Sequence, residues 1–212
     1  MWKLAPLILT IFLLSSCNDH QVRSKPALPA TSGKTGSLPD TVTVDSVALI
    51  MNLTKQVLSV IKAKDYTTLG SFFHPVAGTR FSHYGHIDTI NDRKFTATQF
   101  LEQLGNSGKL NWGNYDGSGE EIFLTVDHYF KRFVYNADFL HAEKTSLNKM
   151  IGKGNSLNNL EAVYKDRDFT ESYFAGFDKQ LEGMDWSSLR LVFESYKDKV
   201  YLVAIIHDQW TI

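Results

Sequence analysis

Two apolar runs near the C-terminus stand out in the pattern of hydrophobic and polar positions along the chain. Residues 189–193 and 200–206 are rich in β-branched and aromatic side chains, contain neither Gly nor Pro, and flank the polar stretch 194–199. Runs of this kind predict a long antiparallel hairpin. The second run is apolar on both faces, so we expect it to lie inside a sheet that is covered on either side.

The helical spacing of apolar residues predicts that helices lead the chain. Asp45 offers an N-cap, and apolar residues then recur with a helical period up to Ile61, so the first helix should end near Lys64. Asp65 would cap a second, shorter helix. His74 should end that helix, because a residue that precedes proline is pushed out of the helical region.

Shorter signals predict the remaining elements. Thr96 and Gln99 have the spacing of a capping box, and the helix that they open should stop at Gly105. Thr125 would cap another helix. Extended stretches predict strands at 78–84, 122–124 and 169–174, and a Gly- and Asn-rich loop is expected at 152–159.

Helices lead and strands close the chain, so the expected fold class is α+β: N-terminal helices packed on a curved, mostly antiparallel sheet ending in a long C-terminal hairpin. This order of elements resembles the cone of nuclear-transport-factor-2-like (SnoaL-like) proteins. The composition agrees with one domain that has a substantial core, because 43% of the 212 residues are hydrophobic. The formal net charge of −1 gives no support for nucleic-acid binding.

The N-terminus has the pattern of a secretory signal. After Lys3, an apolar run of roughly 11 residues falls short of the ~20 that a membrane-spanning helix needs, and small residues follow it. Residues 14–17 read Leu-Ser-Ser-Cys and resemble the lipobox of bacterial lipoproteins. The resemblance implies that the sulfur of Cys17 receives a diacylglyceryl group, that the chain is cut before this residue, and that acyl chains anchor the protein to a membrane. The alternative is an ordinary signal peptide with a chance cysteine.

This interpretation divides the chain into a lipoprotein signal peptide at 1–16, a lipidated cysteine with a flexible tether at 17–43, and a single α+β domain at 44–212. The tether contains Pro and Gly among Ser, Thr and Lys and has few large apolar residues, so it cannot bury enough surface to order itself. We therefore expect a protein of the bacterial cell envelope that is lipid-anchored to a membrane and faces the periplasm or the cell surface.

Several stretches of the body resemble a second group of proteins. They lie at 74–75, 78–82, 112–120, 132–135, 176–178, 183–186, 188–193 and 207–212. Together they are similar to an uncharacterised family of bacterial secreted or lipid-anchored proteins, which implies the same setting and lends no activity. Where members of that family often have Ser-Pro-Tyr, this chain has Ser82-His83-Tyr84, which weakens any role built on His83.

Two stretches carry metal-binding residue types. Four zinc-binding side chains lie close together in the sequence: His74, His83, His86 and Asp88. Helical HExxH and paired CxxC spacings are both missing, so solvated or locally bonded histidines are the alternative. Residues 114–121 resemble the start of a calcium loop, but the twelfth position, which needs a bidentate acid, is Thr125. A Gly-rich turn is the alternative there, and we expect neither a metal nor another cofactor.

Charged side chains near the expected strands are further candidates for chemistry. His207 follows the last apolar run and could act as a general base, or it could satisfy a buried hydrogen bond. Arg80 and Arg190 each lie beside apolar strand positions and could bind a carboxylate or phosphate. The alternative is that each arginine pairs with a buried acid such as Asp185 or Asp116.

Aromatic residues offer a binding surface of another kind. Four of them could form a shelf for sugars or peptides, or could instead belong to the core: Trp112, Tyr115, Trp186 and Trp210.

The leading hypothesis is a lipid-anchored envelope domain that binds a small molecule, a glycan or an envelope protein without catalysis. Five candidate ligand-binding residues would line a pocket in the concavity of the sheet: Arg80, Tyr84, Trp112, Arg190 and His207. One alternative is a small cone-type enzyme, a hydrolase or isomerase, with His207 or Asp116 as general base. Another is a structural component of the envelope.

Overall fold

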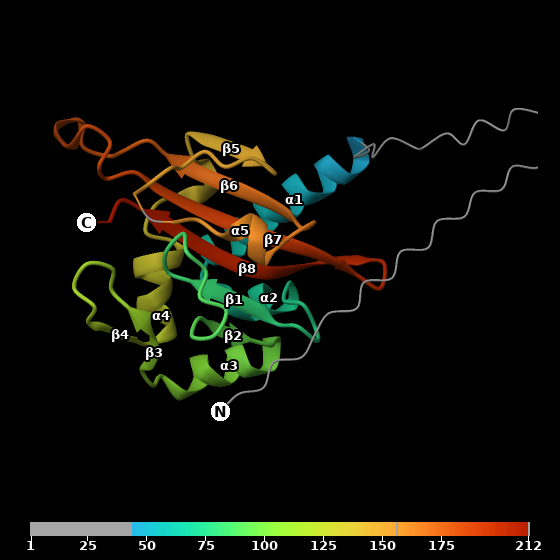
Figure 1. Ribbon diagram of the computed structural model, residues 1–212. Coiled ribbons are helices and arrows are strands. Elements are labelled where there is room, and N and C mark those ends of the chain that lie inside the picture. The colour runs from blue at the N-terminus through green and yellow to red at the C-terminus, as the bar shows by residue number, and fades with distance from the viewer. Residues whose placement is uncertain (1–43, 156, 212) are drawn as a thin grey trace, which may run out of the picture. The chain divides into compact units, whose positions relative to one another are not determined.

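The computed structural model describes residues 44–155 and 157–211 of the chain (Figure 1). Cys17, the predicted signal peptide and the predicted tether lie outside this part, so the lipid anchor stays a prediction. Among the helices of the described residues, none is long and apolar enough to cross a membrane.

The predicted C-terminal hairpin is confirmed. It consists of β7 (Ser187–Tyr196) and β8 (Lys199–Gln209), which extend beyond the two apolar runs at both ends. Lys197 and Asp198 join the strands, and both have positive φ, 47° and 62°. A two-residue type I′ turn requires this backbone conformation, and its twist matches that of the flanking strands.

The hairpin lies at the centre of a six-stranded sheet with the order β2-β1-β8-β7-β6-β5 (Figure 1). β1 runs parallel to β8, and every other neighbouring pair in this sheet is antiparallel. The fold is therefore α+β with a mostly antiparallel sheet, as predicted. The remaining strands are β1 (Thr79–Ser82), β2 (Arg93–Phe95), β5 (Lys144–Leu147) and β6 (Asp168–Phe174), with a separate hairpin of β3 (Leu110–Asn114) and β4 (Glu121–Leu124).

Capping residues set the helix starts largely as predicted. α1 (Val44–Lys62) begins one residue before the predicted cap Asp45. α2 (Tyr66–Ser71) begins after Asp65, whose carboxylate accepts a hydrogen bond from the Thr68 amide.

The capping box of α3 (Ala97–Asn106) is reciprocal: Thr96 accepts from the Gln99 amide, and the Gln99 side chain accepts from the Thr96 amide. The predicted stop at Gly105 is wrong, because Ser107 takes the left-handed cap conformation with φ 49°. Thr125 caps α4 (Val126–Tyr129), which continues as a π-helical turn, η1 (Phe130–Val134). The short elements that remain are η2 (Phe139–His141), α5 (Leu160–Val163) and η3 (Lys179–Leu181).

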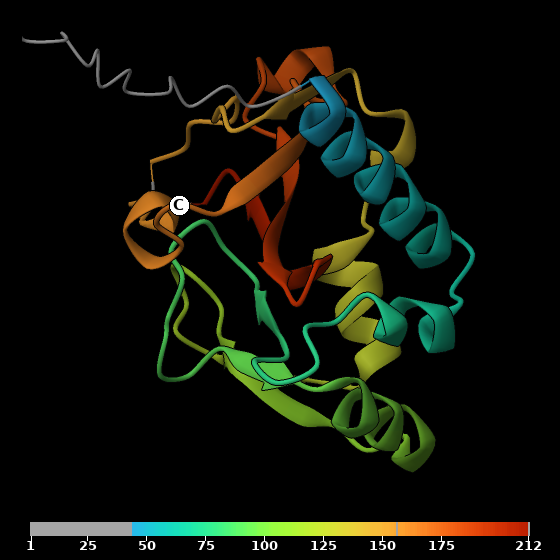
Figure 2. The same ribbon diagram turned by 90° about the vertical axis from the view of Figure 1, so that its right-hand side faces the viewer.

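The sheet has two differently covered faces, which Figure 2 shows on either side of the red strands. On the helix-covered face, α1 to α4 pack on alternate strand residues such as Leu189 and Leu191. Phe81 lies at the centre of this core, with its ring centroid 5.7–6.4 Å from those of Phe73, Phe95, Phe100, Trp112, Tyr129 and Phe130. Aromatic rings thus fill the space between the sheet and the helices.

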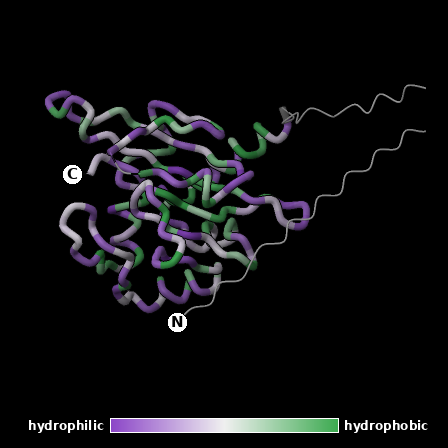
Figure 3. Tube along the Cα trace, viewed as in Figure 1, coloured by the Kyte–Doolittle hydropathy of each residue, from purple (hydrophilic) through white to green (hydrophobic). Residues whose placement is uncertain are grey.

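The loop-covered face is closed by the loop 83–92, by residues 148–155 and 157–159 and by α5 (Figure 2). Its apolar core is smaller and includes Ile87 and Val192. In Figure 3 hydrophobic positions follow the inner strands, whereas the turn between β7 and β8 is hydrophilic. The two faces of one sheet therefore differ in cover and in core.

Candidate functional site

Two adjoining hollows lie where the loop 83–92 meets the β3–β4 hairpin. Their volumes are about 380 Å³ and 400 Å³, and both are lined by Tyr84, Tyr115 and Asp116. The lining carries four carboxylates and one guanidinium group: Asp88, Asp92, Asp116, Glu120 and Arg132. We call these two hollows the acidic cleft.

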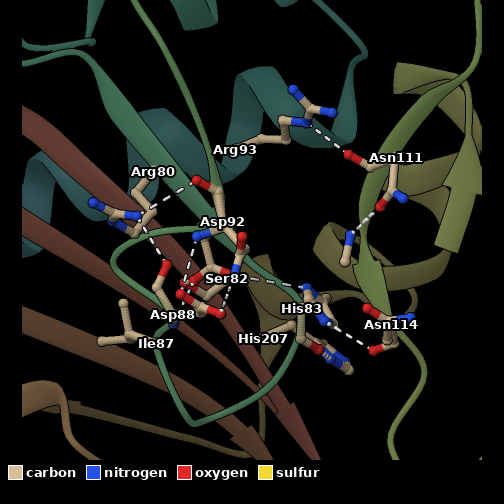
Figure 4. A network of polar contacts seen from close by, with 12 residues as sticks. Arg80, Ser82, His83, Ile87, Asp88, Asp92, Arg93, Asn111, Asn114 and His207 are labelled. Atoms are coloured by element: carbon tan, nitrogen blue, oxygen red, sulfur yellow. Dashed lines mark hydrogen bonds and ion pairs between the residues drawn. The ribbon is translucent and has the colours of Figure 1, made fainter. Parts of the chain in front are cut away.

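The loop on one side of the acidic cleft is held by its own polar side chains. Asp92 accepts hydrogen bonds from the Ser82 hydroxyl at 2.5 Å and from the Asp88 amide at 3.0 Å (Figure 4). The Asp88 carboxylate accepts from the amides of Ile90 and Asn91. These bonds fold residues 88–92 into a turn directly before β2, because each acceptor satisfies an amide that the strand ladder leaves open.

Arg80 braces the same loop from the neighbouring strand. Its Nη1 donates to the carbonyl oxygens of Asp88 at 3.1 Å and of Asp92 at 3.4 Å (Figure 4). The predicted pairing of Arg80 with Asp185 or Asp116 is therefore wrong. The guanidinium group fixes the loop backbone and adds positive charge beside the Asp92 carboxylate.

Asp92 is buried, and this changes its protonation. Only 2% of its side chain is exposed, and burial raises its pKa to about 6 against the opposing effect of the Ser82 and Asp88 hydrogen bonds. Tyr129 is also fully buried, and its pKa is raised by burial and by the charge of Asp92. A carboxyl group with a pKa near 6 exchanges its proton close to neutral pH, as general acids and bases do.

His83 lies beside this buried carboxylate and, like it, lines the acidic cleft. Its Nε2 is 3.2 Å from the Asn114 carbonyl oxygen, so this nitrogen carries the proton that the carbonyl accepts. Its Nδ1 is buried, has no hydrogen-bond partner in the described residues and lies 4.0 Å from Oδ1 of Asp92 (Figure 4). Burial lowers the pKa of His83, against the opposing charges of Asp88 and Asp116.

Gly113 allows the His83 ring to lie against β3. Its φ is +122°, and a Cβ at this position would lie 2.6 Å from Cε1 of His83. Any side chain there would push the imidazole away from Asn114 and Asp92. The glycine is thus a requirement of the site.

The predicted start of a calcium loop is a turn between β3 and β4. Asn114 donates to the Gly119 carbonyl, and Asp116 accepts from the Gly117 amide. The turn places Asp116 at the rim shared by the two hollows. In the described part of the chain, no group of three or more His, Cys, Asp or Glu side chains could hold a metal ion.

The four aromatic residues of the predicted shelf separate. Tyr115 and Trp210 line the acidic cleft, and 42% of Trp210 is exposed. Trp112 is fully buried, stacks on Tyr129 at 3.8 Å and donates its indole N–H to the Leu124 carbonyl. Trp186 is buried on the loop-covered face, where it contacts Gly152.

Of the five candidate ligand-binding residues, Tyr84 alone lines the acidic cleft, while Arg80 supports its loop. Trp112, Arg190 and His207 have no exposed surface to offer a ligand. The structure therefore does not bring the five residues together in one pocket, and the face of the sheet that would form a cone is filled by the aromatic core.

His207 is a neutral core histidine. Its two ring nitrogens lie 3.2 Å from the Ser187 hydroxyl and 3.2 Å from the His83 carbonyl. Burial lowers its pKa to about 3. It supports the site indirectly, because it fixes the backbone of His83.

Arg190 is buried among acids other than those expected. It forms ion pairs with Glu171 at 3.0 Å and with Asp208 at 2.9 Å, on the loop-covered face. The expectation that Arg190 pairs with a buried acid is confirmed, but the acids are Glu171 and Asp208 and not the two examples named, Asp185 and Asp116. Asp185 instead accepts hydrogen bonds from the amides of Phe177 and Asp178.

Sequence reasoning missed Asp92 and Arg132. Asp92 stands in a polar stretch that reads as an ordinary turn, and its burial depends on Ser82, ten positions earlier, and on Tyr129. No known protein-family model matches the chain, and no curated protein matches it.

Proposed function

We propose that this chain is a bacterial envelope lipoprotein whose domain binds a saccharide in the acidic cleft, without catalysis. The observation that carries the proposal is that two adjoining hollows share the rings of Tyr84 and Tyr115 and the carboxylate of Asp116. Each hollow lies within the range of about 300–1,000 Å³ that is usual for ligand pockets.

The lining matches the chemistry of a sugar. Aromatic rings such as Tyr84, Tyr115 and Trp210 present an apolar face to the C–H groups of a pyranose ring. Carboxylates such as Asp116 and Glu120 accept hydrogen bonds from its hydroxyl groups, and Arg132 donates one. An envelope domain would meet such polyols in the surrounding glycans.

Titration calorimetry of the purified domain with a panel of neutral mono- and disaccharides tests this proposal. We expect at least one sugar to bind, and Trp210→Ala and Asp116→Ala each to weaken it about tenfold, which corresponds to 1.4 kcal/mol. Phe177→Ala is the matched control, because 59% of Phe177 is exposed and it lies outside the cleft. If no sugar binds, or if the control weakens binding as much as Trp210→Ala, the proposal fails.

The lipid anchor has its own test. Cys17 is the acylated residue that the lipobox implies, so Cys17→Ser should move the protein from the membrane fraction to the soluble fraction. Mass spectrometry of the wild-type N-terminus should show cleavage before Cys17 and added acyl mass. An intact, unacylated N-terminus contradicts the anchor and leaves the sugar-binding test unaffected.

A second candidate function is acid–base catalysis in the same cleft, such as hydrolysis or isomerisation. The observation that favours it is the unpartnered Nδ1 of His83, 4.0 Å from a buried Asp92 whose pKa is about 6. His207 has no exposed surface, so the structure gives it no contact with a substrate, whereas Asp116 lines the cleft.

Chromogenic ester and glycoside substrates separate the two functions. A hydrolase would show a rate that depends on pH around 6 and that His83→Gln abolishes, while its fold remains intact by circular dichroism. Sugar binding without turnover by the wild-type domain supports the binding proposal.

A further inference from the structure

A second cavity lies on the loop-covered face of the sheet. Its volume is about 730 Å³, almost twice that of either hollow of the acidic cleft. It is lined by the loop 150–154, by residues 158–162 around α5 and by Asp208 of β8. It shares no lining residue with the acidic cleft, and we call it the Asp208 cavity.

The wall of this cavity carries a buried ionic group. Arg190 forms ion pairs with Glu171 at 3.0 Å and with Asp208 at 2.9 Å, and the three side chains are at most 5% exposed. Two carboxylates therefore face one guanidinium group. The excess negative charge lies in a medium of low dielectric constant, where an uncompensated charge is costly.

The hydrogen bonds of the Glu171 carboxylate are all made within the protein. Its carboxylate accepts from the amide of Ile151 at 2.5 Å, from the amide of Gly152 at 3.1 Å and from Nε of Arg190 at 3.1 Å. It thus fastens the loop 150–154 over the sheet and has little acceptor capacity left.

Asp208 is different, because it lines the cavity. Its Oδ1 accepts from the Gln209 amide at 3.1 Å, and its Oδ2 forms an ion pair with Nη1 of Arg190 at 2.9 Å. Gly85 approaches the same carboxylate so closely that a Cβ there would lie 2.6 Å from Oδ2. The carboxylate is held in place and keeps free lone pairs.

The rest of the lining combines a second acid with apolar surface. Glu161 adds a carboxylate, and Met150 and Ala162 add apolar contact. Lys153 is the one cation in the lining, it is exposed, and it forms no ion pair or hydrogen bond with other described residues. Among the described residues, Asp208 therefore has Arg190 as its cationic partner and no other.

We propose that the Asp208 cavity binds an organic cation, with its ammonium or guanidinium group against the Asp208 carboxylate and its aliphatic part against Met150 and Ala162. The bound charge would balance the second carboxylate of the ionic group. A cation that also reaches Glu161 would gain a second ion pair, so a short diamine fits the lining best.

Nuclear magnetic resonance of the isotope-labelled domain tests this site with cadaverine as the probe and n-pentanol as its uncharged match. We expect cadaverine, at concentrations up to about 10 mM, to shift the amide signals of 150–154 and 158–162, and n-pentanol to bind about tenfold more weakly or not at all. No shift at these positions, or equal binding of the two probes, overturns the proposal.

Two variants then separate charge from shape. Asp208→Asn keeps the volume of the side chain and removes its charge, and we expect it to weaken cadaverine binding about tenfold. Glu161→Gln lies outside the ionic group, so it keeps the fold and should weaken the binding of the diamine a few-fold. Unchanged affinity in both variants overturns the proposal, and shifts confined to His83 and Tyr115 would assign the amine to the acidic cleft instead.

Discussion

The two faces of the sheet bury different kinds of side chain under different cover. On the helix-covered face, α1 to α4 close over rings and aliphatic side chains such as Phe81, and most of the buried apolar residues gather there. On the loop-covered face, loops close over a smaller core and over the charged side chains of Glu171, Arg190 and Asp208. The first face is filled, and the second holds a cavity of about 730 Å³.

A shift of one residue along a strand decides which face a side chain joins. In β7, Leu189 and Leu191 belong to the aromatic core, and Arg190 between them belongs to the ionic group. Successive strand residues point to opposite faces, so one ten-residue strand serves both. Burial of apolar surface lowers the free energy of the folded state. A buried ionic group contributes little net stability, because the cost of desolvating its charges offsets their attraction. The helix-covered face therefore buries most of the apolar surface, and the loop-covered face holds the ionic group and the Asp208 cavity.

The largest effect that we expect comes from the helix-covered face. Phe81→Ala removes a fully buried ring that contacts six other aromatic residues, and it should lower the free energy of unfolding by about 4 kcal/mol. Denaturant unfolding measures this loss. Phe123→Ala is the control, because 52% of Phe123 is exposed, and it should cost less than about 0.5 kcal/mol. Equal losses in the two variants would contradict the central place of Phe81.

The next effect is expected on the loop-covered face. Arg190→Met leaves Glu171 and Asp208 buried without their cation, and it should lower the free energy of unfolding at pH 7 by about 3 kcal/mol. The loss should shrink toward pH 4, because burial already raises the pKa of Asp208 and protonation removes its charge. A loss that is the same at both pH values would show that packing, not charge, is what Arg190 contributes.

The sequence predicts some elements of the fold much better than others. The hairpin and the caps at Asp65 and Thr96 follow from local signals, so they could be predicted. β5 reads Lys-Thr-Ser-Leu and β2 reads Arg-Lys-Phe, so neither edge strand carries an alternating pattern long enough to detect.

The candidate sites are harder to predict, because their partners come from distant positions. Tyr84 was expected at a ligand site and lines the acidic cleft. Glu171 and Arg190 face one another through the register of β6 and β7, which no local pattern specifies. Asp92 is buried by tertiary contacts alone, and its role could not be read from a turn-like stretch.

The buried Asp92 in the acidic cleft should make the free energy of unfolding depend on pH. The pKa of Asp92 rises from 3.8 to about 6 on folding, so the folded state holds the proton more tightly than the unfolded state. Stability from this group is fully present below pH 3.8 and is lost as the pH rises through 6. The whole difference is about 3 kcal/mol, because each pKa unit corresponds to 1.36 kcal/mol.

Asp92→Asn isolates this contribution, since the amide keeps the oxygen that accepts from Ser82 and Asp88. We expect the difference in unfolding free energy between variant and wild type to grow by up to about 3 kcal/mol in favour of the variant from pH 4 to pH 8. Denaturant unfolding at several pH values measures it. A difference that does not change with pH would mean that Asp92 titrates normally.

The smallest expected effect concerns how the loop-covered face is closed. Asn159 binds both backbone groups of Ile87: its Oδ1 accepts from the Ile87 amide at 2.8 Å, and its Nδ2 donates to the Ile87 carbonyl at 3.0 Å. Asn159→Ala leaves this buried residue's backbone without partners and should cost about 1–2 kcal/mol. Hydrogen exchange at the Ile87 amide should accelerate, while exchange within α1 should change no more than global stability requires.

Asn106→Ala, at the exposed end of α3, is the control and should leave the Ile87 amide protected. Unchanged protection in Asn159→Ala would show that the loop 83–92 is held by apolar packing. The two faces of the sheet would then both be closed by apolar contacts, and the difference between them would be lost.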